Sequence, residues 1–220
     1  QQSSTPRRAR IVVLISGSGS NLQSLIDASD QNELNGDIVA VISNNPGVKG
    51  LERAANAGIA AETLNHREFS ERESFDQKLA ELVLSYQPDL IILAGFMRIL
   101  TPGFVNQFAG RLLNIHPSLL PKYPGLNTHQ RAIDAGDDQA GATVHFVTSE
   151  LDGGPPIVQC AVPILPEDTA EKLAARVLTV EHKIYPLAAR WFCEGRLQLK
   201  DGAVILDSDK LPASGFRYTL

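Results

Sequence analysis

The chain of 220 residues has few cysteines, and their placement suits neither a disulfide nor a metal scaffold. Cys160 and Cys193 are the only two, they lie far apart, and they form no Cys-x-x-Cys pair. That pattern argues against both a disulfide framework and a zinc site. We therefore expect a cytoplasmic protein with reduced thiols and no bound metal.

Excess positive charge and long apolar runs are lacking too. The 20 Lys and Arg residues are outnumbered by 25 Asp and Glu residues, which gives a formal net charge of −5. Such a chain has no overall positive field to attract nucleic acid or a membrane surface, so an anionic ligand needs a local site. No apolar run approaches the roughly 18 residues of a membrane span, and no signal-peptide core precedes the first strand. The expected partners are small molecules, with the protein itself a monomer or homodimer.

The chain does contain a regular alternation of strand-like and helix-like segments. Apolar runs that predict strands fall at residues 10–15, 37–44, 60–64, 88–96 and 111–116. Helical patterns lie between the first four of them, beginning at Asn21 and covering residues 50–58 and 69–86. This order is typical of right-handed βαβ units. We therefore expect an α/β fold: a single-domain, Rossmann-like open twisted sheet, mainly parallel, with helices on both faces.

The second half of the chain departs from that alternation. Strands predicted at residues 141–148 and 157–164 have no room for a helix between them, which indicates an antiparallel C-terminal portion of the sheet. A long helix is expected at residues 169–194, and residues 197–206 predict a hairpin turned at Asp201-Gly202. The polar residues 1–9 are interpreted as a disordered leader, so the domain is expected to span residues 10–220.

A glycine-rich loop, residues 16–21, connects the first strand to the first helix. Phosphate groups bind at that place in α/β folds because backbone amides at a helix N-terminus point outward. The loop lacks the third glycine of a dinucleotide fingerprint, where Leu22 stands, and it lacks the lysine of a Walker loop. It suits one phosphate monoester, with Ser18, Ser20 and Asn21 as extra donors. A plain strand-to-helix turn with Ser20 or Asn21 as N-cap is the alternative.

An Asn-x-His pair ends the fifth predicted strand. In an extended chain Asn114 and His116 project to the same face, while Leu113 and Ile115 face the other way. The following Pro117 holds the chain extended, and ligands in such sheets bind at the carboxyl ends of strands. An amide and an imidazole aimed at one point stabilise an oxyanion, and the imidazole also moves a proton. An edge histidine with a capping asparagine is the structural alternative.

A carboxylate that orients the histidine would complete this group. Asp152 follows a predicted strand, in the Gly- and Pro-rich residues 149–156, and is a candidate to reach His116. Because Asp-Gly is common in turns, Asp152 taken alone is equally well explained as a turn residue. His145 is expected to pack within the sheet rather than to act in catalysis.

The order and spacing of five motifs resemble the phosphoribosylglycinamide formyltransferases, enzymes of purine synthesis: ISGSGSN, LAGFMRIL, LLNIHPSLLPKYPG, VHFVTSELDGGP and EHKIYP. The likeness runs from about residue 10 to residue 196. It implies transfer of a formyl group from 10-formyltetrahydrofolate to the amine of glycinamide ribonucleotide. In that reaction Asn114 and a protonated His116 would donate to the oxyanion, and Asp152 would hold the imidazole charged and help to move the amine proton.

Carried over position by position, the resemblance implies three sets of residues. The catalytic set is Asn114, His116 and Asp152. The ribonucleotide-binding set is Gly19, Ser20, Asn21 and Glu181. The folate-binding set is Arg72, Met97, Arg98, Ile99, Leu100, Asn114, Thr148, Ser149, Glu150, Leu151 and Asp152.

The chain departs from the family pattern at a few positions, and three other functions stay open. Ser18 stands at a variable position, Leu178 replaces a common polar residue near the ribonucleotide, and Pro156 replaces an aliphatic one. A methionyl-tRNA formyltransferase shares the His-Pro-Ser-Leu-Leu-Pro segment but needs a tRNA-binding domain and a basic surface. A formyltetrahydrofolate hydrolase normally has a regulatory domain before the first strand, where nine residues stand here. A non-catalytic nucleotide-binding module would leave Asn114 and His116 without a role.

Overall fold

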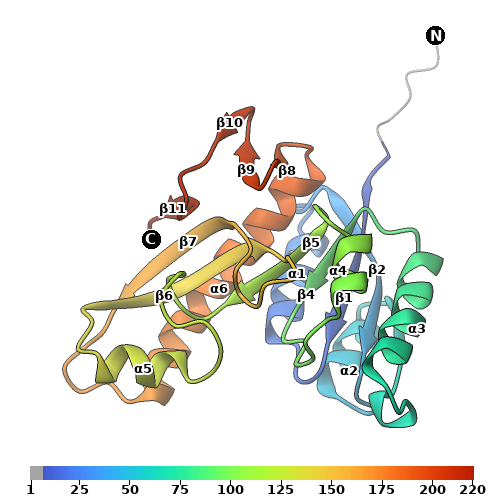
Figure 1. The fold of residues 1–220 in the computed structure, drawn as a ribbon, viewed down its shortest axis with the longest axis horizontal. Coiled ribbons are helices and arrows are strands. Elements are labelled where there is room, and N and C mark those ends of the chain that lie inside the picture. The colour runs from blue at the N-terminus through green and yellow to red at the C-terminus, as the bar shows by residue number, and fades with distance from the viewer. Residues whose placement is uncertain (1–6) are drawn as a thin grey trace.

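The computed structural model describes residues 7–220. Figure 1 shows a twisted sheet with helices packed against both of its faces. The helices are α1 (Ser20–Asp30), α2 (Lys49–Asn56), α3 (Arg72–Ser85), α4 (Pro102–Gln107), α5 (Thr128–Asp134) and α6 (Ala170–Cys193), with a 3-10 turn η1 (His66–Glu68). The strands are β1 (Ala9–Ile15), β2 (Gly36–Ser43), β3 (Ala60–Thr63), β4 (Leu90–Leu93), β5 (Leu112–His116), β6 (Gln139–Phe146), β7 (Pro156–Pro163), β8 (Leu197–Lys200), β9 (Ala203–Leu206), β10 (Asp209–Lys210) and β11 (Phe216–Tyr218).

The main sheet has the strand order β11-β7-β6-β5-β4-β1-β2-β3. Strands β1 to β5 pair in parallel, β6 is antiparallel to β5 and to β7, and β11 joins the edge parallel to β7. Strands β8, β9 and β10 form a separate antiparallel sheet. The predicted α/β fold, with a mainly parallel sheet and an antiparallel C-terminal portion, is confirmed.

Alternating side chains of β1 show how the sheet builds two apolar layers. Ile11, Val13 and Ile15 pack with buried residues of α1 and α6, whereas Val12 and Leu14 pack with those of α3 and α4. Every one of these β1 side chains is fully buried. A strand covered on both faces reads as a continuous apolar run, which is why residues 11–15 contain no polar residue.

The order in which the chain adds strands to the sheet reverses beside β1. The chain runs from β1 outward through β2 to β3, and then returns to the other side of β1 with β4. In open α/β sheets, ligands bind beyond the carboxyl ends of the strands at this switch point. The segments that follow β1, β4 and β5 all begin there, so the fold gathers the glycine loop and the Asn-x-His pair at one edge.

Several elements differ from the sequence predictions. Strand β1 begins at Ala9, which pairs with Gly36, so Ala9 belongs to the sheet and not to a leader. The part of the predicted leader at residues 1–6 lies outside the described residues. The short helices α4 and α5 and the strands β10 and β11 were not predicted. The terminal hairpin is confirmed, with Asp201 and Gly202 at φ 51° and 75°, as a two-residue primed turn requires.

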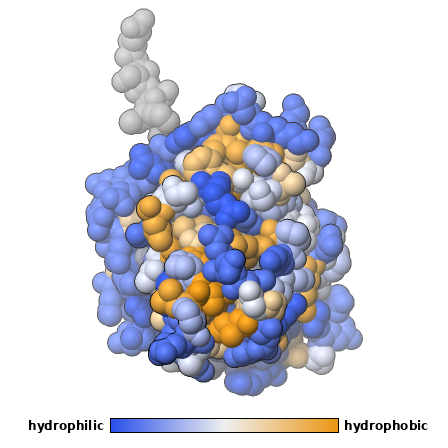
Figure 2. All heavy atoms as spheres, turned by 90° about the vertical axis from the view of Figure 1, so that its left-hand side faces the viewer, coloured by the Kyte–Doolittle hydropathy of each residue, from blue (hydrophilic) through white to orange (hydrophobic). Residues whose placement is uncertain are grey.

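The surface at the left of Figure 1, around α5 and the ends of β6 and β7, is shown in Figure 2. Apolar side chains gather there in several patches that polar side chains interrupt. Within residues 7–220, no helix combines the length and the apolar character needed to cross a bilayer.

Candidate active site

The Asn-x-His pair projects to the face of β5 that the sequence predicts. Leu113 and Ile115 pack into the layer of α1 and α6, so Asn114 and His116 point to the opposite face. Both line a cavity of about 550 Å³. His116 is only 6% exposed, and its Nε2 atom lies 2.8 Å from the carbonyl oxygen of Tyr123. Because a carbonyl only accepts, Nε2 carries a proton, and Nδ1 is the ring nitrogen that lies toward Asp152.

Asp152 reaches this histidine from the loop after β6. Its Oδ1 atom lies 3.5 Å from His116 Nδ1, and its Oδ2 atom accepts the amide of Gly125 at 2.8 Å. The side chain is 8% exposed, and the residue has a φ of 52°. A non-glycine residue in the left-handed region marks a locally constrained turn, and such turns concentrate at functional sites. The carboxylate therefore links the imidazole to the loop that follows β5.

His145 lies opposite Asn114 in the β5–β6 pair and also lines the cavity. It is buried, and its Nδ1 atom lies 2.9 Å from the carbonyl oxygen of Phe146. Burial lowers the pKa of the imidazole, which the nearby Phe146 carbonyl and Asp152 only partly offset. A neutral, buried side chain bonded within the sheet agrees with the structural role that the sequence predicts for it.

The cavity of about 550 Å³ beside Asn114 and His116 is lined mainly by the residues expected to bind folate. Met97 and Ile99 are exposed at 74% and 55%, so apolar side chains stand open beside the catalytic candidates. Arg72 is exposed at the first residue of α3 and is not one of the lining residues. The expected folate-binding residues that do line the cavity are Met97, Arg98, Ile99, Leu100, Asn114, Thr148, Ser149, Glu150, Leu151 and Asp152. A cavity of this size, lined by both apolar and polar side chains, suits an aromatic ligand that carries polar groups.

The glycine loop lines a second, smaller cavity of about 280 Å³. Gly19 is the N-cap of α1 and has a φ of 69° with no side-chain cap, so neither Ser20 nor Asn21 is the N-cap. A Cβ atom on Gly19 would lie 3.1 Å from the Cα atom of Gly50. Positive φ and close approach together explain why glycine stands here. Met97 lines this cavity as well as the larger one, so the two cavities adjoin at that residue.

Glu181 comes to the glycine loop from α6. Its Oε1 atom accepts a hydrogen bond from Asn21 Nδ2 at 3.2 Å, which brings together two of the residues expected to bind the ribonucleotide. Burial raises the pKa of the Glu181 carboxyl to about 7, and the bond from Asn21 offsets part of that rise. One turn further along α6, the hydroxyl of Tyr185 lies 2.6 Å from the Leu93 carbonyl oxygen and 3.1 Å from that of Leu113.

Three further residues hold the site together, and sequence reasoning missed them. Tyr123 and Gly125 act through backbone atoms on His116 and Asp152, and backbone contacts leave no side-chain signal in a sequence. Asn45 lines the smaller cavity and donates from Nδ2 to the Ser16 carbonyl at 2.9 Å. The polar run Ser-Asn-Asn at the end of the second strand was a usable signal for Asn45, since it stands beside the glycine loop.

The cavity brings together side chains whose chemistry suits proton transfer and the binding of an oxyanion. Asn114 offers an amide, His116 offers an imidazole, and Asp152 places a carboxylate oxygen 3.5 Å from Nδ1 of that ring. In the part of the chain that the structure describes, no three His, Cys, Asp or Glu side chains are grouped as metal ligands.

Comparisons with known proteins identify the family of the chain. The model of the formyl transferase family matches residues 9–189. The phosphoribosylglycinamide formyltransferase of Escherichia coli K12 is 54% identical over 206 residues, which cover 94% of this chain and 97% of that protein. The trifunctional purine biosynthetic protein adenosine-3 of Drosophila melanogaster is 49% identical over 197 residues, which cover 89% of this chain but 15% of that longer protein.

A solved structure extends the agreement from sequence to fold. The phosphoribosylglycinamide formyltransferase of Coxiella burnetii is 48% identical and superposes with a TM-score of 0.92, covering 96% of this chain and all of that one. The likeness extends over nearly the full length of both chains. The chain therefore belongs to the formyl transferase family of enzymes and, within that family, to the phosphoribosylglycinamide formyltransferases.

Proposed function

We propose that this enzyme transfers the formyl group of 10-formyltetrahydrofolate to the amine of glycinamide ribonucleotide, a step of purine synthesis in the cytoplasm. The observation that carries the proposal is the adjoining of two cavities at Met97. The smaller cavity, with the glycine loop and Asn21, suits the ribonucleotide phosphate and ribose. The larger cavity suits the folate ring. Placed in this way, the two ligands meet beside Asn114 and His116.

The proposed reaction needs no covalent enzyme intermediate. The amine nitrogen forms a bond to the formyl carbon, and the carbonyl oxygen becomes an oxyanion. Asn114 and His116 Nδ1 donate to that oxygen, because Nε2 is already bonded to Tyr123. The bond between the carbon and N10 of the folate then breaks, and one amine proton ends on N10. Asp152 accepts the amine proton and passes it to N10, directly or through water, because His116 already carries protons on both ring nitrogens.

The ribonucleotide and folate sets are proposed from the same geometry. Gly19, Ser20 and Asn21 would bind the phosphate, and Glu181 would contact the ribose. Arg72 would meet the glutamate tail beyond the cavity, since Arg98 stacks 4.5 Å above the Phe75 ring, one turn along α3 from Arg72. The candidate catalytic side chains all come from one chain, so the proposed chemistry needs no second subunit.

An ultraviolet assay for loss of the formyl group from 10-formyltetrahydrofolate tests the proposal. Purified protein is assayed with and without glycinamide ribonucleotide, and the N-formyl product is measured in parallel. We expect turnover that depends on the ribonucleotide, with one product formed for each folate deformylated. Equal turnover without the ribonucleotide would indicate a hydrolase. No turnover with a folded protein would indicate a binding module. A parallel assay with methionyl-tRNA in place of the ribonucleotide tests the other acceptor, and turnover with that acceptor alone would indicate a methionyl-tRNA formyltransferase.

A further inference from the structure

Three successive carbonyl groups of the glycine loop, those of Ser16, Gly17 and Ser18, accept hydrogen bonds from residues outside the loop. Asn45 Nδ2 donates to the Ser16 oxygen at 2.9 Å, and the Gly50 amide donates to the Gly17 oxygen at 3.1 Å. Arg53 Nε donates to the Ser18 oxygen at 2.7 Å. Gly50 and Arg53 both belong to α2, so this helix restrains two successive peptide groups of the loop.

A trans peptide directs its N–H group opposite to its C=O group. The carbonyls of Gly17 and Ser18 face α2, so the amides of Ser18 and Gly19 point away from that helix. Within residues 7–220 neither amide donates to a protein acceptor. The smaller cavity is lined by the loop but by no residue of α2. Two successive outward amides of this kind form an anion-binding concavity.

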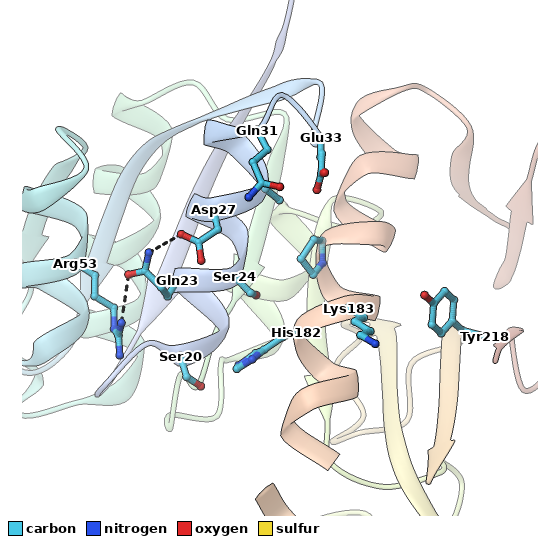
Figure 3. A pocket seen from close by; sticks show the side chains of 12 residues that line it. Ser20, Gln23, Ser24, Asp27, Gln31, Glu33, Arg53, His182, Lys183 and Tyr218 are labelled. Carbon is cyan, nitrogen blue, oxygen red and sulfur yellow. Dashed lines mark hydrogen bonds between the residues drawn. The ribbon is translucent and has the colours of Figure 1, made fainter. Parts of the chain in front are cut away.

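Arg53 is itself held in place by a chain of side chains on α1. Its Nη1 atom donates to Gln23 Oε1 at 3.2 Å, and Gln23 Nε2 donates to Asp27 Oδ1 at 2.8 Å. Figure 3 shows these contacts along the outer side of α1, at a groove of about 720 Å³ between α1 and α6. The guanidinium therefore connects α1, α2 and the loop without lining the smaller cavity.

We propose that Arg53 is a positioning residue for the ribonucleotide phosphate. By holding the Ser18 carbonyl, it keeps the Gly19 amide directed at the phosphate, although it does not touch the phosphate itself. This inference rests on the proposed function of the glycine loop. The loss of one hydrogen bond from a charged donor is expected to weaken phosphate binding by about tenfold.

Two substitutions separate the hydrogen bond from the charge. Arg53→Gln removes the charge but keeps an N–H donor at the same number of bonds from Cα as Nε. Arg53→Met keeps a similar stem and removes both charge and donor. Lys49→Met is the matched control, because Lys49 is an exposed cation of the same helix that donates to no loop carbonyl in the described part of the chain.

Binding of glycinamide ribonucleotide, inorganic phosphate and 10-formyltetrahydrofolate is measured by calorimetry, and the Gly19 amide is followed by ¹⁵N–¹H spectra during phosphate titration. We expect Arg53→Met to weaken ribonucleotide and phosphate binding about tenfold, so that the Gly19 shift appears only at about tenfold higher phosphate concentration. Arg53→Gln and Lys49→Met are expected to stay within about threefold of the parent, with folate binding unchanged throughout.

Equal weakening by both Arg53 variants, or weakening by Lys49→Met, would assign the effect to charge and overturn the inference. Unchanged binding in every variant, or equal loss of folate binding in Arg53→Met, would overturn it as well. A parent protein that binds neither ribonucleotide nor phosphate at Gly19 would contradict the proposed function of the loop and this inference with it. Binding by the parent and all variants alike would contradict only the role of Arg53.

Discussion

The Oδ1 atom of Asp152 lies 3.5 Å from the Nδ1 atom of His116, while the other oxygen of the same carboxylate accepts the Gly125 amide. One side chain thus performs two tasks, an electrostatic one toward the imidazole and a structural one toward a loop. Substitutions that keep the second task and remove the first can separate them.

Asp152→Asn is the first such substitution. An asparagine keeps an oxygen that can accept the Gly125 amide, but it removes the negative charge that lies 3.5 Å from His116 Nδ1. The turnover number is expected to fall about 10²- to 10⁴-fold, because acid–base assistance is lost. The Michaelis constants for both substrates should change little, since the loss falls mainly in the transition state.

Asp89→Asn is the matched control for Asp152→Asn. Asp89 also accepts a backbone amide, that of Arg10 at 2.8 Å, but it lies at the start of β4 and away from His116. Its turnover number should match that of the parent. If Asp152→Asn turned over within about threefold of the parent, Asp152 would be a turn residue with no part in catalysis.

Gly19→Ala tests the phosphate loop. The new Cβ would lie 3.1 Å from the Gly50 Cα at a φ of 69°, so we expect a loss of about 1–3 kcal/mol in unfolding free energy and weaker ribonucleotide binding. Folate affinity should stay near that of the parent. Gly58→Ala is the control, since Gly58 has a φ of 73° with no atom within 4 Å of the added Cβ. Equal loss of both ligands in folded Gly19→Ala protein would contradict the assignment of the loop.

Glu181→Gln tests the buried carboxyl on α6. The Glu181 pKa is raised by burial to about 7, so the folded protein holds this proton up to a higher pH than the unfolded chain does. Its contribution to stability is complete at acid pH and is lost as pH rises from about 4.5 toward 7. The variant should therefore be more stable than the parent at pH 8, by about 1–3 kcal/mol, and close to it at pH 5. Urea unfolding at both values measures this, and identical pH profiles would show that Glu181 is charged throughout.

Arg72→Ala tests the proposed contact with the folate tail. We expect a higher Michaelis constant for a formyl folate with its glutamate and no change for one without it, because Arg72 stands outside the cavity. The turnover number should change less than the Michaelis constant. Arg67→Ala, at another exposed arginine in η1, is the control. An effect limited to the ribonucleotide constant would exclude Arg72 from the folate site.

Local patterns predicted the parts of the fold and site that depend on neighbouring residues. The face of Asn114 and His116 follows from the two-residue period of a strand, and the glycine loop from its place between a strand and a helix. The contact between Asn21 and Glu181 spans 160 positions, and the backbone partners of His116 and Asp152 leave no pattern. The short α4 and α5 and the edge strand β11 depend on packing against distant elements, so periodicity does not reveal them.

Tyr185 connects α6 to the strands that carry the candidate catalytic residues. Strands β4 and β5 share two paired positions, Ile91 with Leu112 and Ile92 with Leu113. At the end of this pairing the Tyr185 hydroxyl lies near the carbonyl oxygens of Leu93 and Leu113. The hydroxyl has one proton, so it donates a hydrogen bond to only one of these two carbonyl oxygens at a time. The same helix carries Glu181 one turn earlier, against the glycine loop. Helix α6 thus contacts the ends of β4 and β5 through Tyr185 and the glycine loop through Glu181, so one helix supports both parts of the candidate site.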